Sequence, residues 1–270
     1  MFDILFVRTF LLVGMMLLIT TCATRINKDF ETGWEALLTI GGTFLFLFAI
    51  TFFSHIFPLN LFLVACFAGI VGWSLGPTIT HLGRSFKLKR FCKVRGIKVK
   101  KDPEDKDKEL RYKENEKGEI KIITDKEWEG YIKEFENYIA KEGDPYNKAW
   151  QDIVFQALMG TTLAVFCTCT IVFLSDVDFS FLGLFLFIAL LLLIIVSFLN
   201  IFIFKSSKVS LVKAYFGVLV FTLYLLFDFS RLKSLMTQGE TSWSAAIDIA
   251  VNLYLDIINL FLDLLQILAD

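Results

Sequence analysis

The sequence is poor in the residues that build metal centres and disulfide frameworks. It has two histidines, His55 and His81, and five cysteines in 270 residues. Four of the cysteines stand in apolar runs, where a free cysteine behaves as a small hydrophobic residue. An odd number of scattered cysteines implies no disulfide framework, and the two histidines lack the spacing of zinc ligands. We therefore expect neither a structural metal nor a cofactor.

Charged residues are scarce over most of the chain. The net charge is −1, and 34 of the 55 Asp, Glu, Lys and Arg residues lie between Arg84 and Lys148. Because the basic residues are neither in excess nor separated from acidic ones, nucleic acid is not an expected partner. The sequence is 56% hydrophobic with a mean hydropathy of +0.62, too apolar for a water-soluble globule. We expect a membrane protein, with the lipid bilayer as its partner and one soluble insert.

Long apolar runs set the predicted fold. A hydrocarbon core of about 30 Å needs about 20 apolar residues in a helix that rises 1.5 Å per residue. Seven nearly uncharged runs are long enough: residues 5–24, 35–56, 59–80, 152–174, 180–204, 210–230 and 246–268. The first run keeps Arg8 and has no convincing cleavage pattern, so we interpret it as a span and not as a signal peptide. The predicted fold class is an all-α membrane protein, a seven-transmembrane-helix bundle with a small soluble α+β insert between spans three and four.

The spans and the charged segment divide the chain into three parts. We expect spans one to three in residues 1–83, the charged soluble insert in 84–150 and spans four to seven in 151–270. Lys and Arg near span ends tend to stay on the cytoplasmic side, and here they follow spans one, three and five. This pattern predicts an outer N-terminus, an inner C-terminus and a cytoplasmic insert. A bacterial inner membrane and an endoplasmic reticulum membrane both fit.

The insert has a pattern of its own. The segments LRYKEN and EIKIIT flank a turn at residues 116–118, which predicts a short hairpin. Thr124 and Glu127 form a capping box that opens a helix with apolar residues at helical spacing, and Gly143 with Pro145 ends it. Two interpretations stay open. The insert docks, on the bundle or on a protein partner, or it is a solvated spacer with one amphipathic helix.

Two acidic residues fall inside predicted spans. Asp228 lies in YLLFDFSRL near the end of the sixth span, and Asp256 lies in NLYLDIINLF well inside the seventh. An ionisable side chain at membrane depth costs about 2.5 to 3.5 kcal/mol, so each one needs a reason to be there. Depth counted along these two antiparallel helices allows the two carboxylates to face each other. We call Asp228 and Asp256 the aspartate pair.

Polar residues form one stripe along the seventh span. Asn252, Asp256, Asn259 and Asp263 are spaced by four, three and four residues, which places them on one face of a helix. We call these four residues the polar stripe. It is either part of a polar pathway or ion site through the bundle, or a set of interhelical hydrogen bonds that holds the span in place. We favour the functional interpretation for Asp256 and the structural one for Asp263.

The aspartate pair predicts a gate. In a site of low polarity, desolvation and mutual repulsion favour retention of a proton, and the pair titrates as a unit. A shared proton closes the site through a carboxyl–carboxylate hydrogen bond, whereas two negative charges repel one another and attract a cation. Calcium prefers oxygen ligands and suits such a site. We therefore expect a pH-sensitive calcium leak, although a proton-coupled carrier fits two carboxylates almost as well.

Three segments resemble a known family. The run NLYLDIINLFLDLLQIL resembles the last span of the Bax inhibitor-1 family, also called the transmembrane Bax inhibitor motif family. The run PLNLFLVACFAGIVGWSLGP at 58–77 looks like the third span of that family, and FVRTF at 6–10 is similar to its first. The resemblance implies a seven-helix bundle and a pH-sensitive calcium leak governed by two aspartates on the last two spans, which match Asp228 and Asp256.

The sequence departs from the family pattern at three places. Ser230 and Arg231 follow Asp228 where relatives continue toward a glutamine, which makes Arg231 a candidate partner of Asp228. The second span is uncharged over 36–54 where relatives can carry an arginine, and His55 substitutes for it only when protonated. The third departure is the size of the insert. With Asn252 and Asn259, Arg231 and His55 complete the predicted supporting polar residues of the ion pathway.

Two other classes of function remain as alternatives. An intramembrane aspartyl protease also uses two aspartates on adjacent spans. Such enzymes resemble one another in a glycine-containing motif just before the second aspartate, but Tyr254 and Leu255 precede Asp256 here. We therefore expect no enzymatic activity. The other alternative is a non-conducting membrane scaffold that regulates partners through the insert.

Overall fold

A computed structural model gives the fold of the chain and describes residues 3–30, 32–101, 109–114, 120–141, 144–204 and 206–270. The chain divides into two compact units. The first holds residues 1–80, 155–268 and 270, and we call it the membrane bundle. The second holds residues 81–154 and 269, and we call it the insert unit.

Seven helical segments of the described chain are long and apolar enough to cross a membrane. They are α1 (Ile4–Ile26), α2 (Gly33–Phe53), α3 (Leu59–Val94), α5 (Asn147–Leu174), α6 (Gly183–Leu199) with the short helices η1 (Phe179–Leu182) and η2 (Asn200–Phe204) at its ends, α7 (Ser207–Thr237) and α8 (Trp243–Ala269). Each predicted span falls in one of these segments, except that the second, 35–56, runs three residues beyond the end of α2. The predicted all-α membrane fold with seven spans is therefore confirmed.

Several helices extend beyond the apolar runs that predicted them. Helix α3 has 36 residues, about 54 Å at 1.5 Å per residue, whereas the predicted span ended at residue 80. Its last part carries Arg84, Lys87, Lys89 and Arg90, and both Lys and Arg are good helix formers. Charge therefore ends the apolar run without ending the helix.

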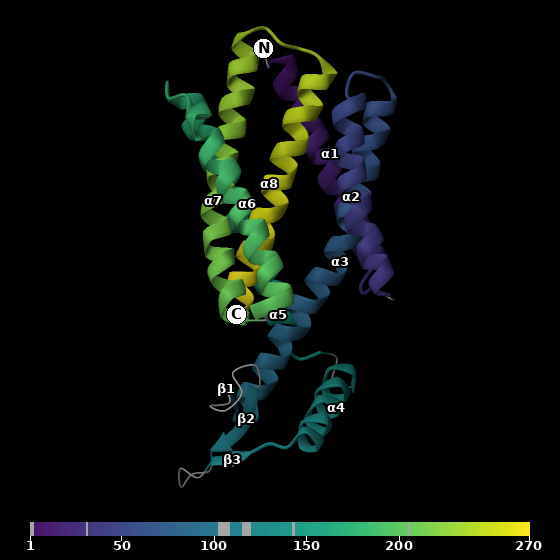
Figure 1. Cartoon of the computed structure of the whole chain (residues 1–270), viewed down its shortest axis with the longest axis vertical. Coiled ribbons are helices and arrows are strands. Elements are labelled where there is room, and N and C mark those ends of the chain that lie inside the picture. The colour runs from purple at the N-terminus through teal and green to yellow at the C-terminus, as the bar shows by residue number, and fades with distance from the viewer. Residues whose placement is uncertain (1–2, 31, 102–108, 115–119, 142–143, 205) are drawn as a thin grey trace. The chain divides into compact units, whose positions relative to one another are not determined.

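The α7–α8 connection is a tight turn. Gly239 has a φ of 75°, a conformation that glycine adopts without strain. The amide of Gly239 donates to the Met236 carbonyl and that of Glu240 to the Leu235 carbonyl, both at 3.0 Å, which is the Schellman pattern at a helix end. Helix α8 then begins after Ser242, whose hydroxyl accepts a hydrogen bond from the Ala245 amide at 3.2 Å. Figure 1 shows the resulting antiparallel pair of long helices.

Helix α8 supplies much of the core of the membrane bundle. Its fully buried residues include Ala246, Ile247 and Tyr254. The Tyr254 hydroxyl lies 2.6 Å from Thr20 Oγ1, which donates to the Ala68 carbonyl at 3.0 Å. These two hydrogen bonds join α8 to α1 and α3. Apolar side chains on the outer faces of the bundle stay exposed, as expected for surfaces that face lipid.

The insert unit contains a three-stranded antiparallel sheet. Its strands are β1 (Ile97–Lys101), β2 (Glu109–Glu114) and β3 (Ile120–Ile122), in the order β1-β2-β3. The predicted hairpin is confirmed by the pairing of β2 with β3, and its turn at 116–118 lies outside the described residues. Strand β1 was not predicted, because its alternation of Lys with Ile and Val was interpreted only as a basic stretch.

The predicted helix of the insert is α4 (Asp125–Lys141), and its capping box is confirmed. Glu127 Oε2 accepts a hydrogen bond from the Thr124 amide at 2.9 Å, and Thr124 Oγ1 accepts one from the Glu127 amide at 3.4 Å. The bond from the Thr124 amide, helped by Lys121 and the Thr124 hydroxyl, lowers the pKa of Glu127 to about 2. Of the two predicted stop residues, Pro145 follows the helix in a turn and Gly143 lies outside the described residues.

Candidate ion pathway between the last two helices

The aspartate pair lies between α7 and α8. Asp228 on α7 is 3% exposed and Asp256 on α8 is 6% exposed. The two carboxyl groups are within hydrogen-bonding reach of each other when one of them carries a proton. The structure thus brings together the two residues that the sequence singled out, while their role as a pH sensor stays a prediction.

The pair lies deep within the two helices. Nine residues separate Asp228 from the end of α7 at Thr237, and thirteen separate Asp256 from the start of α8 at Trp243. At 1.5 Å per residue these separations are about 14 Å and about 20 Å. Both carboxyl groups therefore lie well inside segments that are long and apolar enough to cross a membrane.

One carboxyl oxygen of the aspartate pair lacks a hydrogen-bond donor among the described residues. Asp256 Oδ2 is buried and accepts no hydrogen bond from an amide, hydroxyl or basic group of the described residues. A buried acceptor without a donor is costly, so such groups often take part in ligand binding or proton transfer. The arrangement leaves an oxygen at the centre of the bundle that can hold a proton or contact a cation.

Tyr224 is a neighbour of the pair that the sequence analysis missed. It lies one helical turn before Asp228 on α7 and interacts electrostatically with both carboxyl groups. Its spacing of four residues from Asp228 is the signal that could have found it, because residues four apart share a helix face. The phenol is thus a further polar group near the two carboxyl groups.

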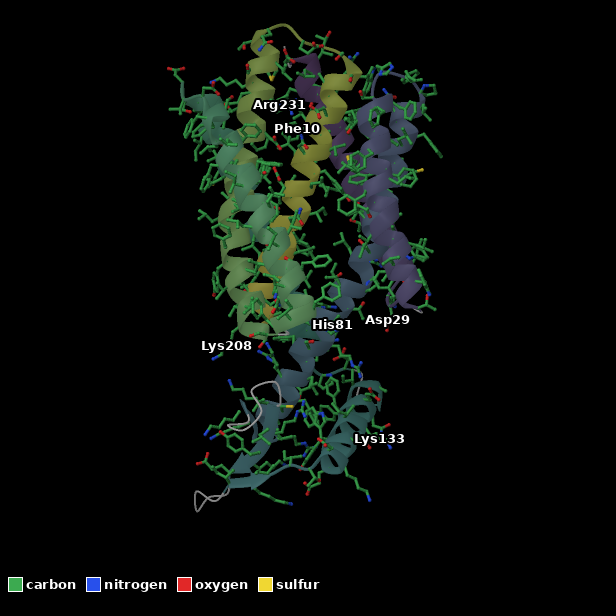
Figure 2. All side chains as sticks on the ribbon, viewed as in Figure 1. Phe10, Asp29, His81, Lys133, Lys208 and Arg231 are labelled. Atoms are coloured by element: carbon green, nitrogen blue, oxygen red, sulfur yellow. The ribbon has the colours of Figure 1, made fainter. Side chains whose placement is uncertain are left out.

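Arg231, the candidate partner of Asp228, acts on Asp228 through its charge but forms no ion pair with it. Arg231 pairs instead with Asp248 on α8, with Nη2 and Oδ2 2.6 Å apart. The reason is depth, since Arg231 lies about 9 Å from the end of α7 and Asp248 about 8 Å from the start of α8. Figure 2 shows Arg231 toward the connected ends of the two helices, while Lys208 lies at the opposite end of the bundle.

The remaining predicted residues are placed as follows. Asn252 is half-buried on α8, and the side-chain amide of Asn259 donates to the Leu255 carbonyl of the same helix at 2.9 Å. Asn259 thus does not make the interhelical bond of the structural interpretation. His55 is exposed in the α2–α3 connection, next to Ser54, which accepts a hydrogen bond from Ser244 at the start of α8, twelve residues before Asp256. Asp263 is 8% exposed and lies against Gly217 of α7.

The described residues contain no group of three or more His, Cys, Asp or Glu side chains that could hold a metal ion. At the aspartate pair, the described residues offer the oxygens of the two carboxyl groups, with the phenol of Tyr224 near them. A firmly bound Ca²⁺ takes six to eight oxygen ligands. These few oxygen ligands of the protein suit brief contact with a cation better than tight binding.

Seven membrane-crossing helices with a buried carboxyl pair between the last two define a multi-pass membrane protein with a polar centre. Residues 145–270, which hold α5 to α8 and the whole polar stripe, match the model of the family described as "Inhibitor of apoptosis-promoting Bax1". The resemblance to the Bax inhibitor-1 family stated from the sequence is confirmed over these residues.

Several relatives are similar to the same part of the chain. The "Golgi anti-apoptotic protein" of Vaccinia virus (strain Lister) is 42% identical over 116 residues, which are 43% of this chain and 46% of the relative. "Protein LIFEGUARD 1" of Arabidopsis thaliana is 36% identical over 121 residues, 44% of this chain and 49% of the relative. An "Uncharacterized membrane protein" of Vibrio cholerae is 34% identical over 117 residues, 43% and 49% of the two chains. The chain spans about half the length of the curated relatives it matches.

Proposed function

We propose that this protein is a pH-sensitive calcium leak of the Bax inhibitor-1 type, gated by protonation of the aspartate pair. The observation that carries the proposal is the contact between Asp228 and Asp256 inside two membrane-crossing helices. The name of the viral relative describes an anti-apoptotic protein of the Golgi. By similarity we propose the same broad role here, with the calcium leak as its molecular activity and no enzymatic step.

The gate works through one proton. When the aspartate pair shares a proton, a hydrogen bond between the carboxyl groups holds α7 against α8. When that proton leaves, two carboxylates face each other in a medium of low polarity, where their repulsion is much stronger than in water. The helices then move apart or a cation enters between the carboxylates.

Calcium fits the donors that the site offers. Carboxylate and phenol oxygens are hard ligands, which calcium prefers. Asp256 Oδ2 accepts no hydrogen bond from the described residues, so a cation that binds this oxygen displaces no donor of the protein. Water supplies the remaining ligands. Because the protein provides few ligands, the cation is held weakly and leaves again, as a leak requires.

The orientation follows from the basic residues. We propose that the N-terminus lies outside and the insert unit lies in the cytoplasm, since Lys and Arg next to spans are retained on that side. The same rule holds whether the membrane is that of the endoplasmic reticulum or a bacterial inner membrane.

Calcium flux into liposomes tests the gate. We expect flux through the parent protein to be low at acidic pH and to rise toward mildly basic pH as the shared proton is lost. Asp228→Asn and Asp256→Asn should each flatten this profile and lower the maximal flux by about tenfold, which corresponds to about 1.4 kcal/mol of lost cation stabilisation. Asp176→Asn, in the exposed α5–η1 connection, is the matched control and should behave as the parent.

Unchanged flux in both pair variants would rule out this mechanism. Cleavage of a labelled membrane substrate by the parent, abolished by Asp256→Asn, would replace the leak with an aspartyl protease. Retention of the pH profile after deletion of the insert, together with loss of a bound protein, would show a separate scaffolding role.

A further inference from the structure

Asp263 is a second buried carboxylate on α8. It is 8% exposed, lies on the polar stripe, and follows Asp256 by seven residues, or about 10 Å along the helix. Among the described residues its side chain makes neither a hydrogen bond nor an ion pair. A buried charge without a bonded partner is costly, and the mechanism above does not use this one.

Gly217 on α7 makes room for this carboxylate. A Cβ atom at Gly217 would lie 2.0 Å from Asp263 Oδ2 and 2.8 Å from its Cγ. The carboxylate therefore lies directly against the α7 backbone, where any other residue would displace it. The backbone amides there are in the interior of α7 and bond within the helix, so they leave the carboxylate without a donor.

The surroundings of Asp263 are polar. Lys213 lies one turn before Gly217 on the same face of α7, and its positive charge acts on Asp263. One turn further along α8, the Gln266 side-chain amide donates to the Ser210 hydroxyl of α7 at 2.5 Å. The α7–α8 seam is thus lined with polar groups from Asp263 toward the start of α7.

We propose that Asp263 is a second site for divalent cations, on the route that begins at the aspartate pair and leads to the cytoplasmic end of the bundle. This inference rests on the proposed leak and extends it to a second place in the same seam. Lys213 supplies the positive charge at the site when no cation is present, and a passing cation takes its place.

Asn259 connects the two sites. It lies between Asp256 and Asp263 on the polar stripe, about 5 Å and about 6 Å from them along the helix. Its side-chain nitrogen donates to the Leu255 carbonyl, which leaves its side-chain oxygen as the atom able to contact a cation. A cation that leaves the aspartate pair meets an oxygen ligand at each turn of α8.

The first test is independent of ion flux. In the full-length protein with its five cysteines replaced by alanine and reconstituted in liposomes, Asp263→Cys is treated with a water-soluble, positively charged methanethiosulfonate reagent. The matched control is Leu265→Cys, a fully buried position on α8 outside the polar stripe. We expect Asp263→Cys to react at least about tenfold faster than the control, because only the seam admits water and cations.

One result of this test overturns the inference, whether or not the protein conducts calcium. It is labelling of Asp263→Cys no faster than that of Leu265→Cys, which would show that water and cations do not reach this position.

The second test separates this site from the gate. We expect Asp263→Asn to lower calcium flux several-fold at every pH without changing the shape of the pH profile, and Lys213→Met to raise flux. Parent-level flux in Asp263→Asn, with the effect of Asp256→Asn intact, overturns the second site and leaves the proposed function standing. No calcium flux through the parent protein overturns the proposed function instead, and the labelling result then decides the inference alone.

Discussion

At the scale of single residues, short polar side chains hold the loop between α5 and η1. Asp178 Oδ1 accepts hydrogen bonds from the Ser180 hydroxyl at 2.6 Å and from the Ser180 amide and the Ser230 hydroxyl at 3.0 Å each. These bonds lower the pKa of Asp178, and those from Ser180 contribute most. The carboxylate caps η1 and ties the loop to α7.

This loop predicts a pH-dependent contribution to stability. Because folding lowers the pKa of Asp178, its contribution is present above the ordinary value of about 4 and is lost as pH falls through the lower, folded value. The melting temperature of the parent should exceed that of Asp178→Asn at pH 7, and the difference should shrink below about pH 4. Thermal unfolding in detergent at both pH values measures it. Asp176→Asn should show no such difference, and an equal gap at all pH values would contradict the argument.

The contact between Gly217 and Asp263 predicts that substitutions at these two residues have non-additive effects on stability. In Gly217→Ala the new methyl group displaces the Asp263 carboxylate, and we expect a loss of about 1 to 3 kcal/mol of stability, as for other overpacked sites. In the Asp263→Ala background the same substitution should cost much less. A double-mutant cycle by denaturant unfolding measures the coupling. Additive effects would mean that the two residues do not touch.

At the scale of helices, an ion pair links α7 to α8 between the aspartate pair and the α7–α8 turn. The side chains of Arg231 and Asp248 are 43% and 51% exposed, so the pair contributes at most about 1 kcal/mol. Arg231→Asp should destabilise the protein because it opposes two acidic side chains, and the added Asp248→Arg should restore most of the loss. Melting temperatures of the two single variants and the double variant provide the measurement. Failure of the double variant to recover would argue against this pairing.

At the scale of the whole molecule, the residues of the proposed ion pathway and the insert belong to different compact units. Phe135 of α4 is 1% exposed and packs on Phe91, with ring centroids 5.5 Å apart. Phe135→Ala should destabilise the insert unit by about 3 to 5 kcal/mol and speed amide exchange in α4. Calcium flux and its pH profile should stay those of the parent, because the pathway residues lie in the membrane bundle. A changed profile would show that the insert regulates the leak.

From the sequence, the helices and strands can be predicted more completely than the contacts between their side chains. Hydropathy predicted seven spans because burial in lipid requires long apolar runs, but it could not show that α3 continues through charged residues. The polar stripe and the two aspartates follow from helical periodicity. The partner of Arg231 does not, because Asp248 becomes its neighbour only when α7 and α8 are aligned in depth. The roles of Tyr224 and Gly217 could not be predicted for the same reason, since they depend on which residues of α8 lie next to them.

The hydrogen bonds of Tyr254 and Thr20 anchor the α8 side of the aspartate pair. Because Tyr254 ties α8 to Thr20, and Thr20 in turn bonds to Ala68, α8 is anchored to α1 and α3 two residues away from Asp256. The Asp256 side of the pair is therefore held against α1 and α3. In the proposed gate, separation of the carboxylates requires α7 to move relative to α8 and to the two helices that hold it.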